Sequence, residues 1–127
     1  MTANKYRAEV DAAEFGKGYT IRLDMDGFGK LETDLGDFTA YERLMWGLPR
    51  LSPKCIKAFL AVALRNEQGV VVGDAKMPEA PVTEIARKCH DALCLFLHGK
   101  TADEWAEEQA AKAAARSTAN PTTGTTA

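Results

Sequence analysis

The twelve residues from Asp24 to Leu35 have part of the pattern of a calcium-binding loop. An EF-hand loop needs oxygen ligands at its first, third and fifth positions, glycine at its sixth and a bidentate glutamate at its twelfth. Asp24, Asp26 and Gly29 match the first, third and sixth positions. The fifth is Phe28 and the twelfth is Leu35, and neither side chain has an oxygen. We therefore interpret Asp24 or Asp26 as the N-cap of a helix, where a carboxylate is favourable.

A second group of potential metal ligands lies further along the chain. His90, Cys94 and His98 are spaced four residues apart, so they share one flank of a helix, and Cys89 is adjacent. Zinc ligands on one helix usually need a ligand from a second element, and nothing in the spacing of Cys55 indicates that it supplies one. Cys89 followed by His90 is not a nucleophilic dyad, because successive helical residues diverge by about 100°. The sequence therefore predicts no metal, no cofactor and no catalytic residue.

A stretch of 23 residues, 43–65, contains five basic residues and no acidic residue: Arg43, Arg50, Lys54, Lys57 and Arg65. It forms either a solvated positive face or a surface that receives an acidic segment, from a partner or from the acidic helix expected after Thr101. Trp46 lies off the apolar stripe of its helix, so it is either a contact residue or packed beneath residues 67–80. The candidate partner-binding residues are Arg43, Met45, Trp46, Arg50, Lys54 and Lys57.

The bulk composition indicates one small domain. The chain has 127 residues, 46% of them hydrophobic, and a net charge of −2, which does not favour nucleic acid as a partner. No stretch approaches the roughly 20 apolar residues that span a bilayer, and the N-terminus has no apolar signal segment. Three cysteines without a leader favour a reducing compartment, so we expect a cytoplasmic location.

The chemistry-bearing residues must be positioned by a hairpin and several helices. Alternating apolar residues predict strands over 6–12 and 19–23, joined as an antiparallel hairpin through a glycine-rich turn. Apolar residues at helical spacing, Met25, Phe28, Leu31 and Leu35, predict a helix over about 25–35. The expected fold class is α+β: an N-terminal antiparallel β-hairpin packed on a bundle of about four to five helices, with residues 1–100 as a single domain.

Capping signals place the other helices. Thr39 and Glu42 form a capping box before a stripe of Tyr41, Leu44, Met45 and Leu48. Ser52 and Pro53 begin a helix that we expect to continue to about residue 65, and 67–80 is expected to be a loop with a short edge strand. Pro81 begins the next helix, with Val82 and Ile85 on its expected buried face and Glu84, Arg87, Lys88 and Asp91 on its polar face. An Ala-rich, solvated helix over 101–116, anchored by Trp105, and a disordered tail over 117–127 complete the prediction.

The order of these elements resembles the small phage tail assembly chaperones, in particular the group related to a tail-cluster protein of gene transfer agents. The resemblance is carried by the hairpin running into Phe28-x-x-Leu31-Glu32-x-x-Leu35-Gly36, by Leu51-Ser52-Pro53 opening a helix that ends Ala61-Val62-Ala63-Leu64-Arg65, and by the helix with Ile85 to Leu97. It covers roughly residues 5–100 and departs from the family pattern at Gly27 and Gly29.

The resemblance implies a non-enzymatic role. Members of this family bind the long, helical tape measure protein and keep it soluble while tail tube subunits assemble around it. The implied location is the cytoplasm of the host bacterium, with the protein absent from the mature virion. The tail tube protein is a further implied partner, no nucleic acid or membrane is involved, and a homo-oligomer is compatible with the role. The alternative is a structural minor tail or neck subunit of the virion.

Overall fold

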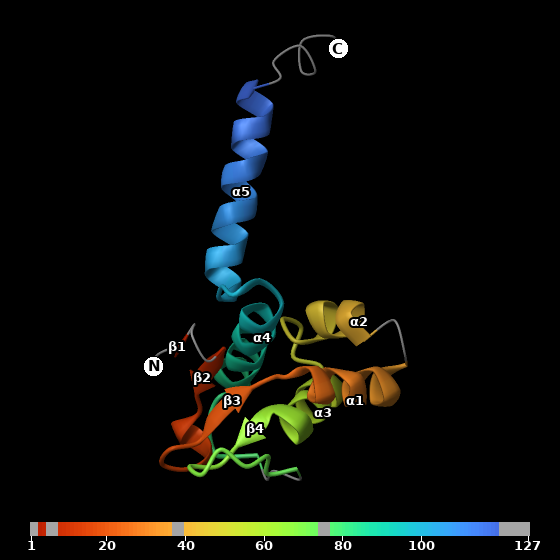
Figure 1. The fold of residues 1–127 in the computed structure, drawn as a ribbon, viewed down its shortest axis with the longest axis vertical. Coiled ribbons are helices and arrows are strands. Elements are labelled where there is room, and N and C mark those ends of the chain that lie inside the picture. The colour runs from red at the N-terminus through yellow and green to blue at the C-terminus, as the bar shows by residue number, and fades with distance from the viewer. Residues whose placement is uncertain (1–2, 5–7, 37–39, 74–76, 120–127) are drawn as a thin grey trace.

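A computed structural model describes residues 3–4, 8–36, 40–73 and 77–119. It confirms the α+β class: a small antiparallel sheet packs against helices (Figure 1). The sheet order is β1-β2-β3-β4, with β1 (Ala3–Asn4), β2 (Glu9–Asp11), β3 (Thr20–Arg22) and β4 (Leu64–Arg65). The helices are α1 (Met25–Leu35), α2 (Ala40–Gly47), α3 (Pro53–Ala63), α4 (Val82–His98) and α5 (Ala102–Ala119), with a 3-10 turn η1 (Ala13–Phe15).

The predicted hairpin is present as β2 and β3. Val10 pairs with Ile21, and both side chains are fully buried beneath α4, which packs on these two strands. The first strand is shorter than predicted, because it begins at Glu9. Ala8 has a φ of 54°, a left-handed conformation that an extended strand does not adopt, and residues 6 and 7 lie outside the described residues.

The predicted continuation of the third helix to residue 65 is wrong. Helix α3 ends at Ala63, and the chain turns into β4, where Leu64 pairs with Ile21 of β3. Extended backbone here buries Leu64 completely and satisfies the open edge of β3, which a further helical turn could not do. An isolated bridge between Arg65 and Val71 then supplies the short edge pairing expected within 67–80.

The junction between β3 and α1 is a capped helix start. The Asp24 side chain accepts a hydrogen bond from the Gly27 N–H at 2.7 Å, so Asp24 is the N-cap. The Arg65 guanidinium donates to the same carboxylate at 2.9 Å, and these contacts hold the pKa of Asp24 below its usual range. Because Met25–Leu35 is one continuous helix, this segment contains no EF-hand loop.

The buried face of α1 consists of Gly27, Leu31 and Leu35. Met25, which we expected on that face, is 73% exposed. Two residues correspond to about 200° around a helix, so burying Gly27 turns Met25 toward solvent. Gly27 lies where α1 packs on α3: a Cβ at this position would be in van der Waals contact with Cβ of Val62 at 3.4 Å and would lie 3.2 Å from Oδ1 of Asp24.

Helix α4 is the centre of the fold, and two of its predicted solvent-facing residues are buried. Lys88 is 5% exposed, and its Nζ lies 2.5 and 2.6 Å from the two carboxylate oxygens of Glu14. Asp91 is 8% exposed, and its carboxylate accepts a hydrogen bond from the Ala102 N–H at 3.0 Å. The prediction failed because both partners come from other elements of the fold, η1 and α5.

Helix α5 extends away from the body of the molecule (Figure 1). Its start follows the predicted capping box, with the Thr101 N–H donating to Glu104 at 3.0 Å, and Trp105 stacks on His98 with ring centroids 3.8 Å apart. The helix ends at Ala119, so residues 117–119 are helical and not part of a tail, while 120–127 lie outside the described residues. Among the described helices, none is long and apolar enough to cross a membrane.

Candidate partner-binding surface

A surface between α3, α4 and their connections combines exposed apolar side chains with a cationic edge. Three segments contribute: the turn after α2, the first turns of α3, and residues 77–82, which lead into α4. The turn ends at Ser52, which is the N-cap of α3: its hydroxyl accepts a hydrogen bond from the Cys55 N–H at 3.4 Å. Pro53 occupies the first turn of the helix.

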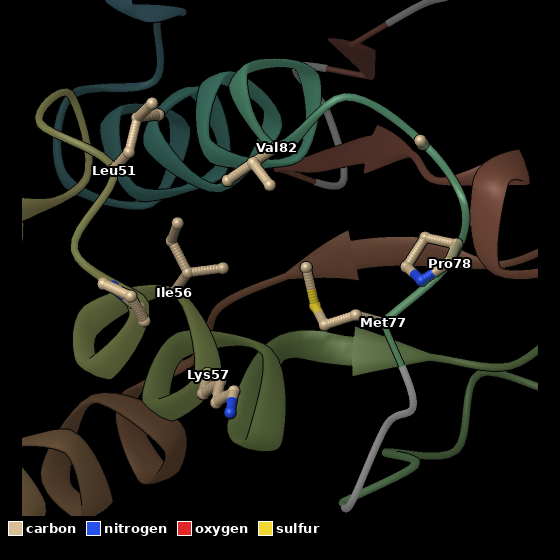
Figure 2. A pocket seen from close by; sticks show the side chains of 8 residues that line it. Leu51, Ile56, Lys57, Met77, Pro78 and Val82 are labelled. Carbon is tan, nitrogen blue, oxygen red and sulfur yellow. The ribbon is translucent and has the colours of Figure 1, made fainter.

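We call the first hollow on this surface the α3–α4 groove. It has a volume of about 220 Å³ and is lined by Leu51, Pro53, Ile56, Lys57, Met77, Pro78, Ala80 and Val82. Figure 2 shows Ile56, Met77 and Val82 pointing toward the space between α3 and the start of α4. Lys57 is the only charged lining residue, so the groove is an apolar hollow with one cationic side.

A second hollow, of about 230 Å³, lies along the first half of α4. Its lining residues are Leu48, Pro49, Leu51, Thr83, Ala86, Arg87 and His90. Leu51 lines both hollows, so they are neighbours separated by one side chain. Each is smaller than the roughly 300–1,000 Å³ of a typical small-molecule site. The α3–α4 groove is lined mainly by apolar residues, whereas the lining of the second hollow also includes Thr83, Arg87 and His90. The size of each hollow suits a single anchoring side chain of a partner protein.

Leu51 is held in an unfavourable backbone conformation between the two hollows. Its φ is 60°, a left-handed value that is rare for a residue with a branched side chain. The Leu51 N–H donates to the Leu48 carbonyl at 3.2 Å, and the Ser52 N–H donates to the Gly47 carbonyl at 2.9 Å. These two bonds form a Schellman motif, in which the position of Leu51 normally belongs to glycine. Strain retained at an exposed position points to a role in contact.

The candidate tryptophan is exposed next to this surface. Trp46 is 62% exposed, so it is not packed beneath residues 67–80. The Arg50 guanidinium lies 4.5 Å from the centroid of the Trp46 ring and donates to the Trp46 carbonyl at 2.9 Å. Arg50 lies between Pro49 and Leu51 in the chain, but neither Arg50 nor Trp46 is a lining residue of either hollow.

The structure brings together only part of the predicted set. Lys57 lines the groove, and Lys54, one turn earlier on α3, is exposed beside it. Arg43 is also exposed, whereas Met45 is half-buried against the core. Arg65 of the basic stretch is bound to Asp24 instead.

Sequence reasoning missed the residues that shape the hollows, above all Leu51, Met77 and Val82. Leu51 precedes the Ser52 cap, a position that usually indicates packing against the helix, and Val82 was assigned to the buried face of α4 although it is 47% exposed. The signal that could have identified Leu51 is the lack of a glycine in the turn between Gly47, the last residue of α2, and Ser52. Met77 and Val82 had no local signal, because a groove is defined by elements distant in sequence.

The acidic helix after Thr101 does not cover the basic stretch, which was one of the two predicted options. Helix α5 packs on α4, and its Glu108 forms ion pairs with Lys100 and Lys112. The surface between α3 and α4 is therefore not occupied by α5.

The two cysteines of α4 are buried, whereas His90 of the same helix lines the second hollow. Cys89 is fully buried, and burial raises the pKa of its thiol far above the ordinary value. Burial also raises the pKa of the Cys94 thiol to about 11, which disfavours the reactive thiolate form at neutral pH. Within the described residues, no three histidine, cysteine or acidic side chains gather as a metal site.

The α4–α5 junction yields a stability prediction for Asp91. Burial raises the pKa of this carboxyl, and the Ala102 N–H only partly counters it. A raised pKa means that the ionised carboxylate weakens the folded state, so stability falls as pH rises through this pKa. We expect Asp91→Asn, which keeps an acceptor for the Ala102 N–H, to be at least as stable as the parent near neutral pH and to lose that pH dependence.

Asp91→Ala is the matched comparison, because it removes the acceptor as well as the charge. We expect it to cost about 1 kcal/mol relative to Asp91→Asn. Urea unfolding at several pH values, with Trp105 fluorescence followed in a Trp46→Phe background, measures both effects. Equal stability of the two variants would show that the hydrogen bond to Ala102 does not hold α5.

Comparisons of this chain with protein-family models, with curated proteins and with solved structures give no match.

Proposed function

We propose that this protein is a tail assembly chaperone of a phage, prophage or gene transfer agent. In this role it binds the helical tape measure protein, keeps it soluble in the cytoplasm of the bacterium and supports assembly of the tail tube, without catalysing a reaction. The resemblance over residues 5–100 suggests the role, and the tail tube protein is a second partner to test.

The observation that carries the proposal is the apolar surface centred on Leu51. Leu51 and Val82 are 37% and 47% exposed and border hollows whose floors include the buried residues Ile56 and Ala86. Covering apolar surface is favourable by about 25 cal/mol per Å², which is the driving force a chaperone uses to mask an apolar helix. A rim of exposed lysines keeps such a surface soluble before the partner binds.

Co-expression with the cognate tape measure protein tests this role. We expect the parent chain to increase the soluble fraction of that protein several-fold, and a Leu51→Asp/Val82→Asp variant to lose most of the effect, because buried carboxylates oppose apolar contact. Met25→Asp is the matched control, since Met25 is also exposed and apolar but lies outside both hollows. Unchanged solubility of the tape measure protein with the parent chain would contradict the proposal.

The structural-subunit alternative makes a different prediction. A minor tail or neck subunit must be present in purified particles, whereas an assembly chaperone leaves before maturation. Quantitative mass spectrometry of mature particles, with the major tail tube protein as the internal standard, distinguishes the two. Stoichiometric recovery of this chain would favour the virion subunit and exclude a purely transient role.

A further inference from the structure

We infer that the partner segment is a single amphipathic helix that carries carboxylates along one flank of its apolar stripe. The stripe fills the α3–α4 groove and the second hollow, and the carboxylates face Lys54 and Lys57 on α3. This inference rests on the proposed partner-binding function and adds the chemistry and orientation of the segment that is bound.

The shape of the surface favours a helix. Two hollows of about 220 and 230 Å³ lie on either side of Leu51, so they can take two apolar side chains from successive turns of one partner helix. In Figure 2, Leu51 and Val82 lie on one side of the space and Ile56 and Lys57 on the other, which leaves the hollow open to an incoming side chain. An extended strand would pair with the edge of a strand, and none of the residues that line the two hollows belongs to a strand.

Charge distinguishes the two walls of the groove. Lys54 and Lys57 are exposed on the α3 wall, where no acidic residue occurs between 43 and 65. The opposite wall has no such excess of positive charge: Glu79 follows the lining residue Pro78, and Arg87, which lines the second hollow, is paired with Glu84 at 2.6 Å. A partner helix with carboxylates on one flank is therefore attracted more strongly to the α3 wall than to the other, so the charges favour one orientation.

The backbone at Leu51 supports a contact role that is independent of charge. Glycine at this position would relieve the strain of a φ of 60°, yet the chain has a leucine whose side chain borders both hollows. The leucine therefore makes the protein less stable than a glycine would. This cost is explained if the Leu51 side chain contacts the partner.

A second copy of the chain is a weaker candidate for this surface. The acidic segment that the described chain could supply is the first half of α5, where Asp103, Glu104, Glu107 and Glu108 gather. The one large apolar residue of that helix, Trp105, is already stacked on His98, so α5 has no apolar stripe to place in the hollows.

Fluorescence anisotropy with two synthetic helical peptides tests the inference. Both have about 18 residues and the same leucine stripe, and one has glutamates where the other has lysines along one flank. We expect the glutamate peptide to bind the intact protein about tenfold more tightly at low salt, with the difference shrinking as salt rises. Equal affinity of the two peptides, or binding of neither, would overturn the inference.

Three variants locate the contact. Lys54→Glu/Lys57→Glu is expected to reverse the peptide preference, while Lys112→Glu on α5, a charge reversal far from the groove, leaves it unchanged. Leu51→Gly is expected to unfold at a higher urea concentration than the parent and to bind the glutamate peptide at least about fivefold more weakly. Undiminished binding by folded Leu51→Gly would also overturn the inference.

The outcomes separate this inference from the proposed function. Binding of the glutamate peptide together with a failure to solubilise the tape measure protein would leave the groove chemistry intact and reject the chaperone role. Solubilisation of the tape measure protein together with binding of neither peptide would support the chaperone role and reject the inferred chemistry of the bound segment. Concentration-dependent dimerisation that excludes the peptide would assign the surface to a second copy and reject the inference.

Discussion

Replacing Lys88 with alanine is expected to lower the free energy of unfolding by about 3 kcal/mol. Lys88 is 5% exposed, and its ammonium lies between the two carboxylate oxygens of Glu14 at 2.5 and 2.6 Å. The substitution removes the ammonium from a mostly buried ion pair and leaves the Glu14 carboxylate without its counter-charge. Chemical denaturation of the parent and the variant measures the loss.

A matched control lies one residue earlier. Arg87 pairs with Glu84 at 2.6 Å on the same helix, but both side chains are about half exposed. Arg87→Ala is therefore expected to cost less than about 1 kcal/mol. Replacing both members of the buried pair, as Lys88→Met/Glu14→Leu, is expected to recover most of the loss, because well-packed apolar side chains can replace a buried ion pair. A similar cost for Arg87→Ala and Lys88→Ala would contradict this account.

The pH dependence gives an independent test of the same pair. Burial alone would raise the pKa of Glu14, but hydrogen bonds from Lys88 and the backbone, with the charge of Lys88, hold it below its usual range. A depressed pKa contributes stability above the unfolded value, and this contribution is lost as pH falls through the folded pKa. The stability difference between the parent and Lys88→Ala should therefore shrink on acidification below about pH 4. A difference that does not change with pH would exclude the ion pair as its source.

Gly47→Ala is expected to destabilise the protein by about 2 kcal/mol, although alanine is the better helix former. A Cβ on Gly47 would lie 2.5 Å from Cys55 Sγ and 3.2 Å from Ser52 Cβ. The Cys55 thiol cannot easily move, because it is buried and donates to the Arg43 carbonyl at 3.4 Å. The clash pushes apart the end of α2 and the start of α3, and this also displaces the turn that presents Leu51.

Another glycine of the chain supplies the control. Gly29 lies in α1, and no heavy atom lies within 4 Å of a Cβ built at that position. Gly29→Ala is therefore expected to raise the free energy of unfolding by about 0.5–1 kcal/mol through helix propensity alone. Adding Cys55→Ala to Gly47→Ala should recover part of the loss, because the two sites are in contact. A stabilising Gly47→Ala would show that α2 and α3 are not packed this closely.

Local patterns were sufficient for the elements whose signals are contiguous in the chain. The caps at Asp24, Ser52 and Thr101 are each made by side chains within three residues of the group they satisfy, so their sequence signatures were reliable. The hairpin was predictable for the same reason, since its two strands are joined by a short turn. Trp105 was also correctly placed as the anchor of α5.

The candidate surface could be predicted only in part. Lys54, Lys57, Arg50 and Trp46 are exposed as an interacting surface requires, because charge and an off-stripe position can be recognised locally. Met45 was assigned to the surface but packs on the core, and the hollows themselves were not foreseen. A hollow depends on which segments lie opposite one another, and residues 77–82 carry no pattern that places them beside α3.

The sequence by itself determined the α+β class, the hairpin and the caps and periodicity of the helices, because these follow from interactions between near neighbours in the chain. Only the tertiary structure decided the fate of Leu64, Lys88 and Leu51. Leu64 is extended and not helical, because it pairs with β3. Lys88 can be buried because the fold brings Glu14, 74 positions away in sequence, within hydrogen-bond distance of its ammonium. Leu51 lies between two hollows whose other lining residues come from α3, α4 and the segment before α4. Each outcome depends on a partner from a distant segment, and polarity and spacing along one element carry no information about that partner.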